Sequence, residues 1–277
     1  LQSSLSNRKK LLILIISCIT ICALVLGVVF GVVKNNDGED PTTALTGPVN
    51  TDYWDSDSTY YDTAWSGSGS VDDPYLIQTA ADLAGLAYNV NSGNTYSGQY
   101  FRQTAPIDLS QHYWRSIGES SNSRPFSGNY DGGGFEISGL FAGIYQNSRC
   151  FFGYVSCTQD VEIKNITIVD SIFKGQDSAG IIGILNMASA SANFTLQNCY
   201  NGALTDNDGN NVKAGMIGRI NLNSSTGTIT IQDCTNAGDI TGYNTVGGIV
   251  AFINNTSSSA TLDFINCHNT GNISGLS

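Results

Sequence analysis

The sequence predicts an all-β fold: a right-handed parallel β-helix, a solenoid of stacked coils, with a short capping helix and one N-terminal transmembrane α-helix. Two repeating features predict the solenoid. Three segments end in Asn-Cys or Asp-Cys, and their cysteines are 35 and 33 residues apart, at Cys199, Cys234 and Cys267. A glycine-containing apolar run repeats in phase with them, with the same spacings between Gly180, Gly215 and Gly248. Such self-similarity is typical of folds in which each repeat buries its apolar face against its neighbours.

A third observation predicts the membrane segment. Residues 11–33 form an apolar run of 23 residues without a charge, which as a helix would span about 34 Å, enough to cross a bilayer. Basic residues precede the run and acidic residues follow it, so the positive-inside bias places residues 1–10 in the cytoplasm and the C-terminal region outside the cell. The alternative is a cleaved signal peptide, whose apolar core would be shorter. We expect an uncleaved single-pass anchor with the lipid bilayer as its partner.

Composition narrows the class of further partners. The chain has 277 residues, a formal net charge of −11 and only 13% charged residues. It has no stripe of Lys and Arg that could neutralise phosphates, so nucleic acid is not an expected partner. An extracellular glycan or protein is the kind of ligand that we expect.

Two segments precede the repeats. Residues 34–65 predict an acidic, turn-rich stalk, and its aromatic cluster at 53–62 is expected to pack onto the first coil, with a ligand-binding patch as the alternative. Residues 66–140 predict an N-terminal capping module with a strand at 73–78 and a helix that opens at Thr79, where Asp82 completes a capping box. Apolar residues recur at helical spacing at Leu83, Leu86, Ala87 and Val90. An amphipathic helix suits the end of a solenoid, whose open apolar face would otherwise meet water.

Residues 141–277 predict the repeats, each with about three short strands separated by turns. The phase of the repeats aligns three columns of residues: Ile166, Cys199, Cys234 and Cys267; Asn165, Asn198, Asp233 and Asn266; and Asn201, Asn236 and Asn269. We interpret these columns, with the glycines Gly180, Gly215 and Gly248, as structural ladders. The cysteines are expected to be buried and reduced, with a disulfide between Cys150 and Cys157 as the alternative.

Several motifs resemble those of GLUG-motif cell-surface proteins. They are the run 67–87, the segments 107–110, 114–118 and 125–140, and the four-residue motifs Gly180-Ile-Ile-Gly183 and Gly215-Met-Ile-Gly218. The pattern departs at 150–153 and 248–251, each of which lacks one glycine. The resemblance covers about residues 66–277. It implies a surface location and a β-helical scaffold, in a module that also accompanies IgA-cleaving metallopeptidases, and it brings no catalytic residue.

The residues themselves indicate no reaction centre. The two histidines, His112 and His268, lack the setting of a zinc peptidase, and no carboxylate column of the kind that a glycan-cleaving β-helix needs is apparent. One weak candidate for a calcium loop is Asp206, Asp208 and Asn210, which lacks the distal Glu and is more often a polar turn. No catalytic residue, metal or cofactor is therefore expected.

The sequence thus predicts a membrane-anchored extracellular β-helical scaffold for adhesion or surface display, and not an enzyme. The alternative is the surface module of a larger enzyme, either a zinc metallopeptidase or a glycan-cleaving β-helix. The chain starts at Leu1 rather than at Met and stops within a repeat at Ser277, so we expect it to be part of a longer protein.

Overall fold

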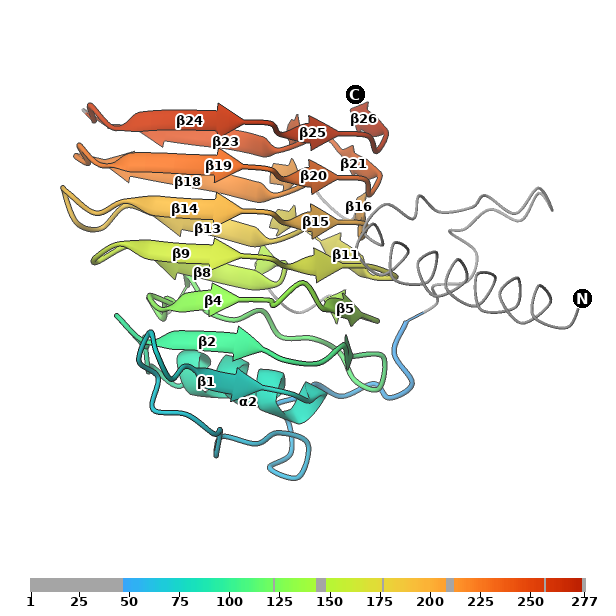
Figure 1. The fold of residues 1–277 in the computed structure, drawn as a ribbon. Helices are drawn as coiled ribbons and strands as arrows, with labels where there is room; N and C mark the ends of the chain where they lie inside the picture. The colour runs from blue at the N-terminus through green and yellow to red at the C-terminus, as the bar shows by residue number, and fades with distance from the viewer. Residues whose placement is uncertain are drawn as a thin grey trace, which may run out of the picture. The chain divides into compact units, whose positions relative to one another are not determined.

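The protein forms a parallel β-solenoid of about five turns with one short helix (Figure 1). The computed structural model describes residues 47–121, 123–142, 148–175, 177–207, 212–256 and 258–275. They belong to one compact unit, Leu45–Ser277. The expected all-β parallel solenoid is confirmed. The expected membrane segment, residues 11–33, and the tail before it lie outside the described residues, and no helix within those ranges is long and apolar enough to span a bilayer.

Five parallel sheets run along the solenoid, numbered here in the order in which each coil passes through them. Sheet 1 contains β1 (Tyr75–Ile77), β2 (Tyr100–Gln103), β4 (Asn129–Asp131), β9 (Val161–Lys164), β14 (Phe194–Gln197), β19 (Thr228–Gln232) and β24 (Thr261–Ile265). Sheet 2 contains β3 (Ile107–Asp108), β5 (Glu136–Ser138), β10 (Thr167–Ile168), β15 (Tyr200–Asn201), β20 (Thr235–Asn236) and β25 (His268–Asn269). Sheet 3 contains β6 (Phe141–Ala142), β11 (Ile172–Gly175), β16 (Leu204–Asn207), β21 (Ile240–Gly242) and β26 (Ile273–Gly275). Sheet 4 contains β7 (Ser148–Arg149), β12 (Asp177–Ala179), β17 (Val212–Ala214) and β22 (Thr245–Gly247). Sheet 5 contains β8 (Phe152–Ser156), β13 (Ile182–Asn186), β18 (Ile217–Asn223) and β23 (Val250–Asn255).

The register between coils follows the sequence repeat. Ile163 pairs with Leu196 and Leu196 with Ile231, as the phase of the repeats predicts. Phe152 pairs with Ile182, so the run at 151–155 lies at the position in its coil that the glycine motifs have in later coils. A full coil contains five strands rather than about three, because two- and three-residue strands at the corners are too short to show a period in the sequence.

The solenoid already begins inside the N-terminal module. Strands β1, β2 and β4 of that module belong to sheet 1, where backbone pairing needs no sequence repeat. Helix α2 (Ala80–Asn91) lies beside β1 and β2 at this end of the stack (Figure 1). Its capping box between Thr79 and Asp82 is confirmed, and its expected apolar face is buried. The helix therefore covers apolar surface of the first coils.

Part of the expected stalk packs against this module. We call residues 49–65 the N-terminal strap. Tyr53 pairs with Tyr113 in a parallel bridge, the Trp54 indole N–H donates to the Leu109 carbonyl at 3.0 Å, and the Trp65 ring contacts Phe101. The expected packing of the aromatic cluster onto the first coils is thus confirmed. The strap is not a free stalk, because burying its indole rings removes large apolar surfaces from water.

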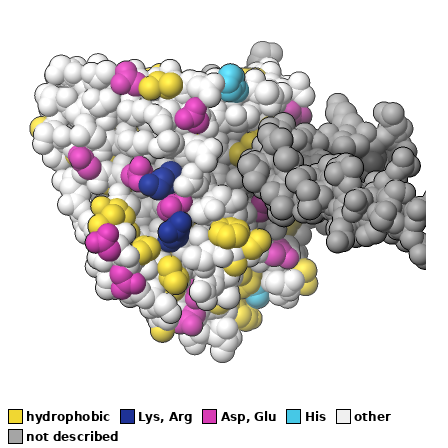
Figure 2. All heavy atoms as spheres, in the orientation of Figure 1, with side chains coloured by type: hydrophobic (Ala, Val, Ile, Leu, Met, Phe, Trp, Pro, Cys, Tyr) yellow, Lys and Arg dark blue, Asp and Glu magenta, His cyan; other side chains and the backbone are white. Residues whose placement is uncertain are grey.

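The outer surface is mostly uncharged and polar, with few Lys and Arg side chains on the face shown in Figure 2. Inward-facing apolar side chains alternate with these outward polar groups, as the burial pattern of β9 and β14 shows. The wall of the solenoid is therefore one residue thick, with a core on one side and solvent on the other.

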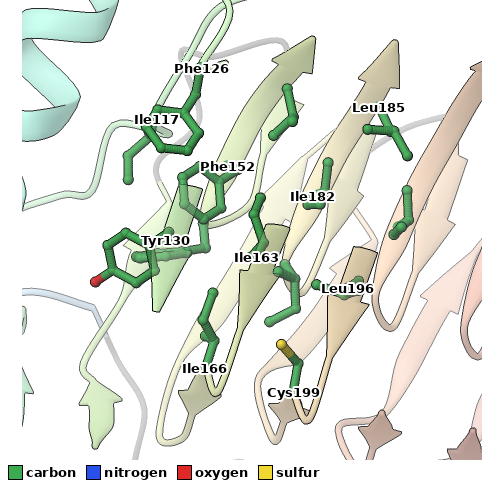
Figure 3. Packing of buried hydrophobic residues seen from close by; sticks show 14 of the residues in the cluster. Ile117, Phe126, Tyr130, Phe152, Ile163, Ile166, Ile182, Leu185, Leu196 and Cys199 are labelled. Atoms are coloured by element: carbon green, nitrogen blue, oxygen red, sulfur yellow. The ribbon is translucent and has the colours of Figure 1, made fainter. Parts of the chain in front are cut away.

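The core changes character along the stack. Its N-terminal end holds aromatic rings, among them Phe126, Phe152 and Tyr130, whose centroids lie 5.0 to 5.6 Å apart in contacting pairs. Later coils replace them with aliphatic side chains such as Ile182 and Leu196, as Figure 3 shows. Each fully buried side chain of this size contributes roughly 1.5–3 kcal/mol. The stacked coils therefore share one continuous core.

Candidate functional site

The glycines of the repeated motif lie against a buried column of asparagines. A Cβ atom on Gly215 would come within 2.4 Å of the Cγ of Asn236 and within 2.0 Å of the carbonyl oxygen of Gly248. Gly180 bears the same relation to Asn201. Asn201 and Asn236 are fully buried, and the Asn201 Nδ2 donates to the Asn236 Oδ1 at 2.8 Å. The motif glycines thus make room for a ladder of amide hydrogen bonds inside the wall.

A second column, which contains Asn165, Asn198, Asp233 and Asn266, occupies a corner of each coil. All four residues have a backbone φ near +50°, a conformation that Asn and Asp tolerate better than other side chains. The side chains also bond between coils: the Asn198 amide donates to Asn165 at 2.8 Å and the Asn266 amide donates to Asp233 at 2.8 Å. The turn geometry and these bonds account for the residue type at this column without a ligand.

The cysteine column continues from Ile166 and lies next to sheet 2. Cys199 and Cys234 are buried, and Cys267 of the last coil is partly exposed. The sulfur atoms of Cys150 and Cys157 are not joined to each other, so the alternative disulfide is absent from the structure. Burial raises the pKa of Cys199 well above its ordinary value and that of Cys157 to about 12. Neutral thiols are poor nucleophiles, so Cys199 and Cys157 act as small apolar groups.

The calcium-loop candidate is only partly described. Asp206 lies on β16, and its carboxylate is 3.5 Å from the Lys174 ammonium of the preceding coil. Asp208 and Asn210 lie outside the described residues. Among the residues described, no group of three or more His, Cys, Asp or Glu side chains could hold a metal ion.

The two histidines occupy unrelated positions. His112 is buried, and its Nδ1 lies 2.6 Å from the Asp52 carboxylate, with the Tyr60 and Trp54 rings against the imidazole. The hydrogen bond to His112 lowers the pKa of Asp52. His268 is exposed on the last coil, as expected from its variable position. The His112 pair joins the N-terminal strap to the cap.

A groove on the outer face of sheet 1 is the best candidate for a functional site. Three strands on successive coils form its floor. Tyr100 and Arg102 on β2, Asp131 on β4, and Glu162 and Lys164 on β9 keep contact with solvent, whereas Asn129 on β4 is buried. Val71 and Pro74 form one wall of the hollow, whose volume is about 130 Å³. In Figure 2, basic side chains gather in the middle of this face with acidic side chains beside them.

Opposite charges alternate along and across the groove. Arg102 is paired with Asp131 in the register, and its Nε lies 4.0 Å from the carboxylate. The Lys164 ammonium lies 2.5 Å from the Glu162 carboxylate on the same strand. The Asp131 carboxylate also accepts the Gly133 N–H at 2.9 Å, a local bond that is common for Asp in turns. Each cation therefore has a carboxylate neighbour, and all four charged side chains keep some contact with solvent.

A second hollow joins the groove at its edge. It has a volume of about 550 Å³ and is lined mainly by polar residues, including Gln159 and Asp160. Tyr100 and Asn129 line both hollows, so the two lie side by side. The Asn129 Oδ1 accepts the Glu162 backbone N–H at 2.8 Å, which holds this amide between the coils. The result is one elongated polar surface with a tyrosine at its centre.

This groove is not marked by a column of carboxylates at equivalent positions of neighbouring repeats, and the sequence therefore did not indicate it. Asp131 lies opposite Lys164, and Glu162 lies two residues before Lys164 on the adjacent coil. A signal did exist: 100–102, 129–131 and 162–164 each have a large aromatic or aliphatic residue in the middle and a charged residue at the end. Only the coil register, however, brings these three segments together.

Comparisons with known proteins give limited similarity. No family model matches the chain. It is 33% identical over 146 residues to Halomucin of Haloquadratum walsbyi, which covers 51% of the chain and 2% of that protein. It is 25% identical over 126 residues to a candidate Gly-rich membrane protein of Evansella cellulosilytica, which covers 43% of the chain and 14% of that protein.

Among solved structures, a candidate immunoglobulin A1 protease from Bacteroides ovatus aligns with a TM-score of 0.42 at 18% identity, over 79% of this chain and 82% of that one. The alignments with the two curated relatives thus cover 2% and 14% of their lengths. The comparisons therefore show local similarity to a protein described as a membrane protein and to a much longer protein.

Proposed function

We propose that this chain is an extracellular display scaffold of the GLUG-motif type, a right-handed β-helix anchored in the membrane by residues 11–33 with its N-terminus in the cytoplasm. The observation that carries the proposal is the structural role of the residues that repeat. Side chains that repeat in phase, such as Asn236 and Cys234, are buried and bonded to neighbouring coils, so repetition builds a rigid wall and leaves the outer face free to vary. The local similarity to a described membrane protein supports the anchored location.

The scaffold binds rather than cleaves in this proposal. General acid–base or covalent catalysis needs a group poised to exchange a proton or attack a bond. The groove carboxylates instead lie beside cations, Asp131 next to Arg102 and Glu162 next to Lys164. Paired in this way, the carboxylates are suited to hydrogen bonding to a ligand.

The location is tested with the full chain carrying one epitope tag before residue 1 and another after residue 277. Protease added to intact cells should remove the C-terminal tag and leave the N-terminal tag intact. Leu24→Arg, in the middle of the apolar run, should release the protein from the membrane fraction, because a central Arg costs about 2.5–3.5 kcal/mol on insertion. Ser3→Arg is the matched control and should leave the protein in that fraction.

Two results would contradict the proposed location. Protection of the C-terminal tag in intact cells would place the solenoid inside. A mature protein that starts near residue 34 would instead show that the run is a cleaved signal peptide, and the membrane anchor would then be abandoned.

A further inference from the structure

We propose that the groove on sheet 1, together with the adjoining hollow, is a binding site for a neutral, hydroxyl-rich glycan chain. This inference rests on the proposed surface function and names the ligand class and its site. The site consists of Tyr100 at the centre, the four charged side chains on one side and the amides and Asp160 on the other.

The charge pattern selects a neutral ligand. Arg102 and Lys164 balance Asp131 and Glu162 within the first hollow, and Asp160 leaves the joined surface with a small negative charge. A polyanion would meet carboxylates beside every cation, and a polycation would meet the reverse. Sugar hydroxyls can donate to a carboxylate and accept from an ammonium or guanidinium at the same time, so alternating charges serve a neutral glycan.

The central tyrosine and the length of the surface favour a chain of several sugars. Tyr100 is partly exposed and lines both hollows, so its ring can lie against the apolar face of one sugar while the neighbouring sugars occupy the hollows on either side. The larger hollow, at about 550 Å³, is within the size range of sites for small molecules. Beyond the groove, the outer face continues with Thr195 and Gln197, which are uncharged hydrogen-bonding side chains.

The backbone of the groove argues against an extended peptide. Such peptides commonly bind by adding a strand to an unpaired sheet edge. The floor strands have neighbours on both sides: β2 lies between β1 and β4, β4 between β2 and β9, and β9 between β4 and β14. The floor of the groove therefore presents side chains to a ligand, and their donors and acceptors can bond to the hydroxyls of a glycan.

Calorimetric titration of the full chain in detergent micelles tests the inference. The probes are neutral hexasaccharides of glucose, galactose, mannose and N-acetylglucosamine, with hexagalacturonate and hexalysine as charged comparisons. We expect at least one neutral hexasaccharide to bind. Tyr100→Ala should raise its Kd about tenfold through loss of the ring contact. Glu162→Gln should also weaken binding, because an amide is a poorer acceptor than a carboxylate.

Tyr243→Ala is the matched control, because Tyr243 is 44% exposed and does not line either hollow. It should leave Kd unchanged, and a melting curve shows whether each variant is folded; if Tyr100→Ala is not, Glu162→Gln decides. The inference is overturned if no neutral hexasaccharide binds at millimolar concentration, or if only a charged probe binds. It is also overturned if Tyr243→Ala weakens binding as much as the groove variants do. A chain that passes the tag-accessibility test and fails here keeps its proposed display function and loses only this site.

Discussion

Replacing Asn236 with alanine removes the middle member of the buried amide column. Its side chain accepts from the Asn201 Nδ2 at 2.8 Å and donates to the Asn269 Oδ1 at 2.7 Å and to the Gly238 carbonyl at 2.8 Å. Alanine removes all three bonds. The Asn201 amide and the Gly238 carbonyl are both buried and lose this partner, whereas Asn269 is exposed and can bond to water.

The magnitude follows from these two buried groups. Each buried polar group that loses its partner costs about 1–3 kcal/mol, so Asn236→Ala should lower the free energy of unfolding by about 2–6 kcal/mol. For a domain of this size, each kcal/mol lowers the melting temperature by roughly 2–4 °C. Thermal unfolding of the full chain followed by circular dichroism therefore measures the effect.

Asn269→Ala is the matched control, since it removes the exposed end of the same column. It leaves the Asn236 amide bonded to Gly238 and to Asn201, so we expect a loss of about 1 kcal/mol or less. Equal melting temperatures for the two variants would refute the reasoning, because burial of the column would then contribute nothing to its strength.

Three further predictions concern packing, thiol chemistry and pH. Gly215→Ala should lower the free energy of unfolding by about 3 kcal/mol or more, because its Cβ would come within 2.0 Å of a backbone oxygen. Gly275→Ala is the control: its Cβ would have nothing within 4 Å, so stability should not change, and similar losses of stability in the two variants would contradict this. Burial raises the pKa of Cys157 to about 12, so this thiol should resist iodoacetamide at pH 8 until the protein unfolds, and its labelling in the folded state would refute the buried assignment. The contribution of the neutral thiol to stability is full below the ordinary pKa of 9.0 and is lost as pH rises toward 12. The hydrogen bond from His112 lowers the pKa of Asp52. The contribution of the Asp52 carboxylate to stability is therefore present above its ordinary pKa of 3.8 and is lost as pH falls through the lower pKa that it has in the folded state. In melting curves from pH 5 to pH 2, Asp52→Asn should therefore lose less stability than the unmodified chain, and parallel curves would exclude this linkage.

Features that depend on local or repeating residues were readable in the sequence. The capping box needs only Thr79 and Asp82, which are three residues apart and bond within one helical turn. The repeat phase of Cys199 and Cys234 predicts their adjacency, because equivalent residues of neighbouring coils must stack. The motif glycines and the buried asparagines also repeat in phase, although their contact across the wall, as between Gly215 and Asn236, appears only in the structure.

The groove and the packed strap depended on the tertiary structure. Arg102, Asp131 and Lys164 are 29 and 33 residues apart in the sequence and share no residue type that would mark them as a column. They meet because each coil closes at its own length, so that unlike segments of the first coils come into register. The strap likewise carries no period, and its indoles are held by surfaces that exist only once the cap has folded. The sequence by itself therefore determined the solenoid, since repetition and backbone pairing suffice to specify stacking; its outer surface was decided by the fold, because that surface is made by residues that do not repeat.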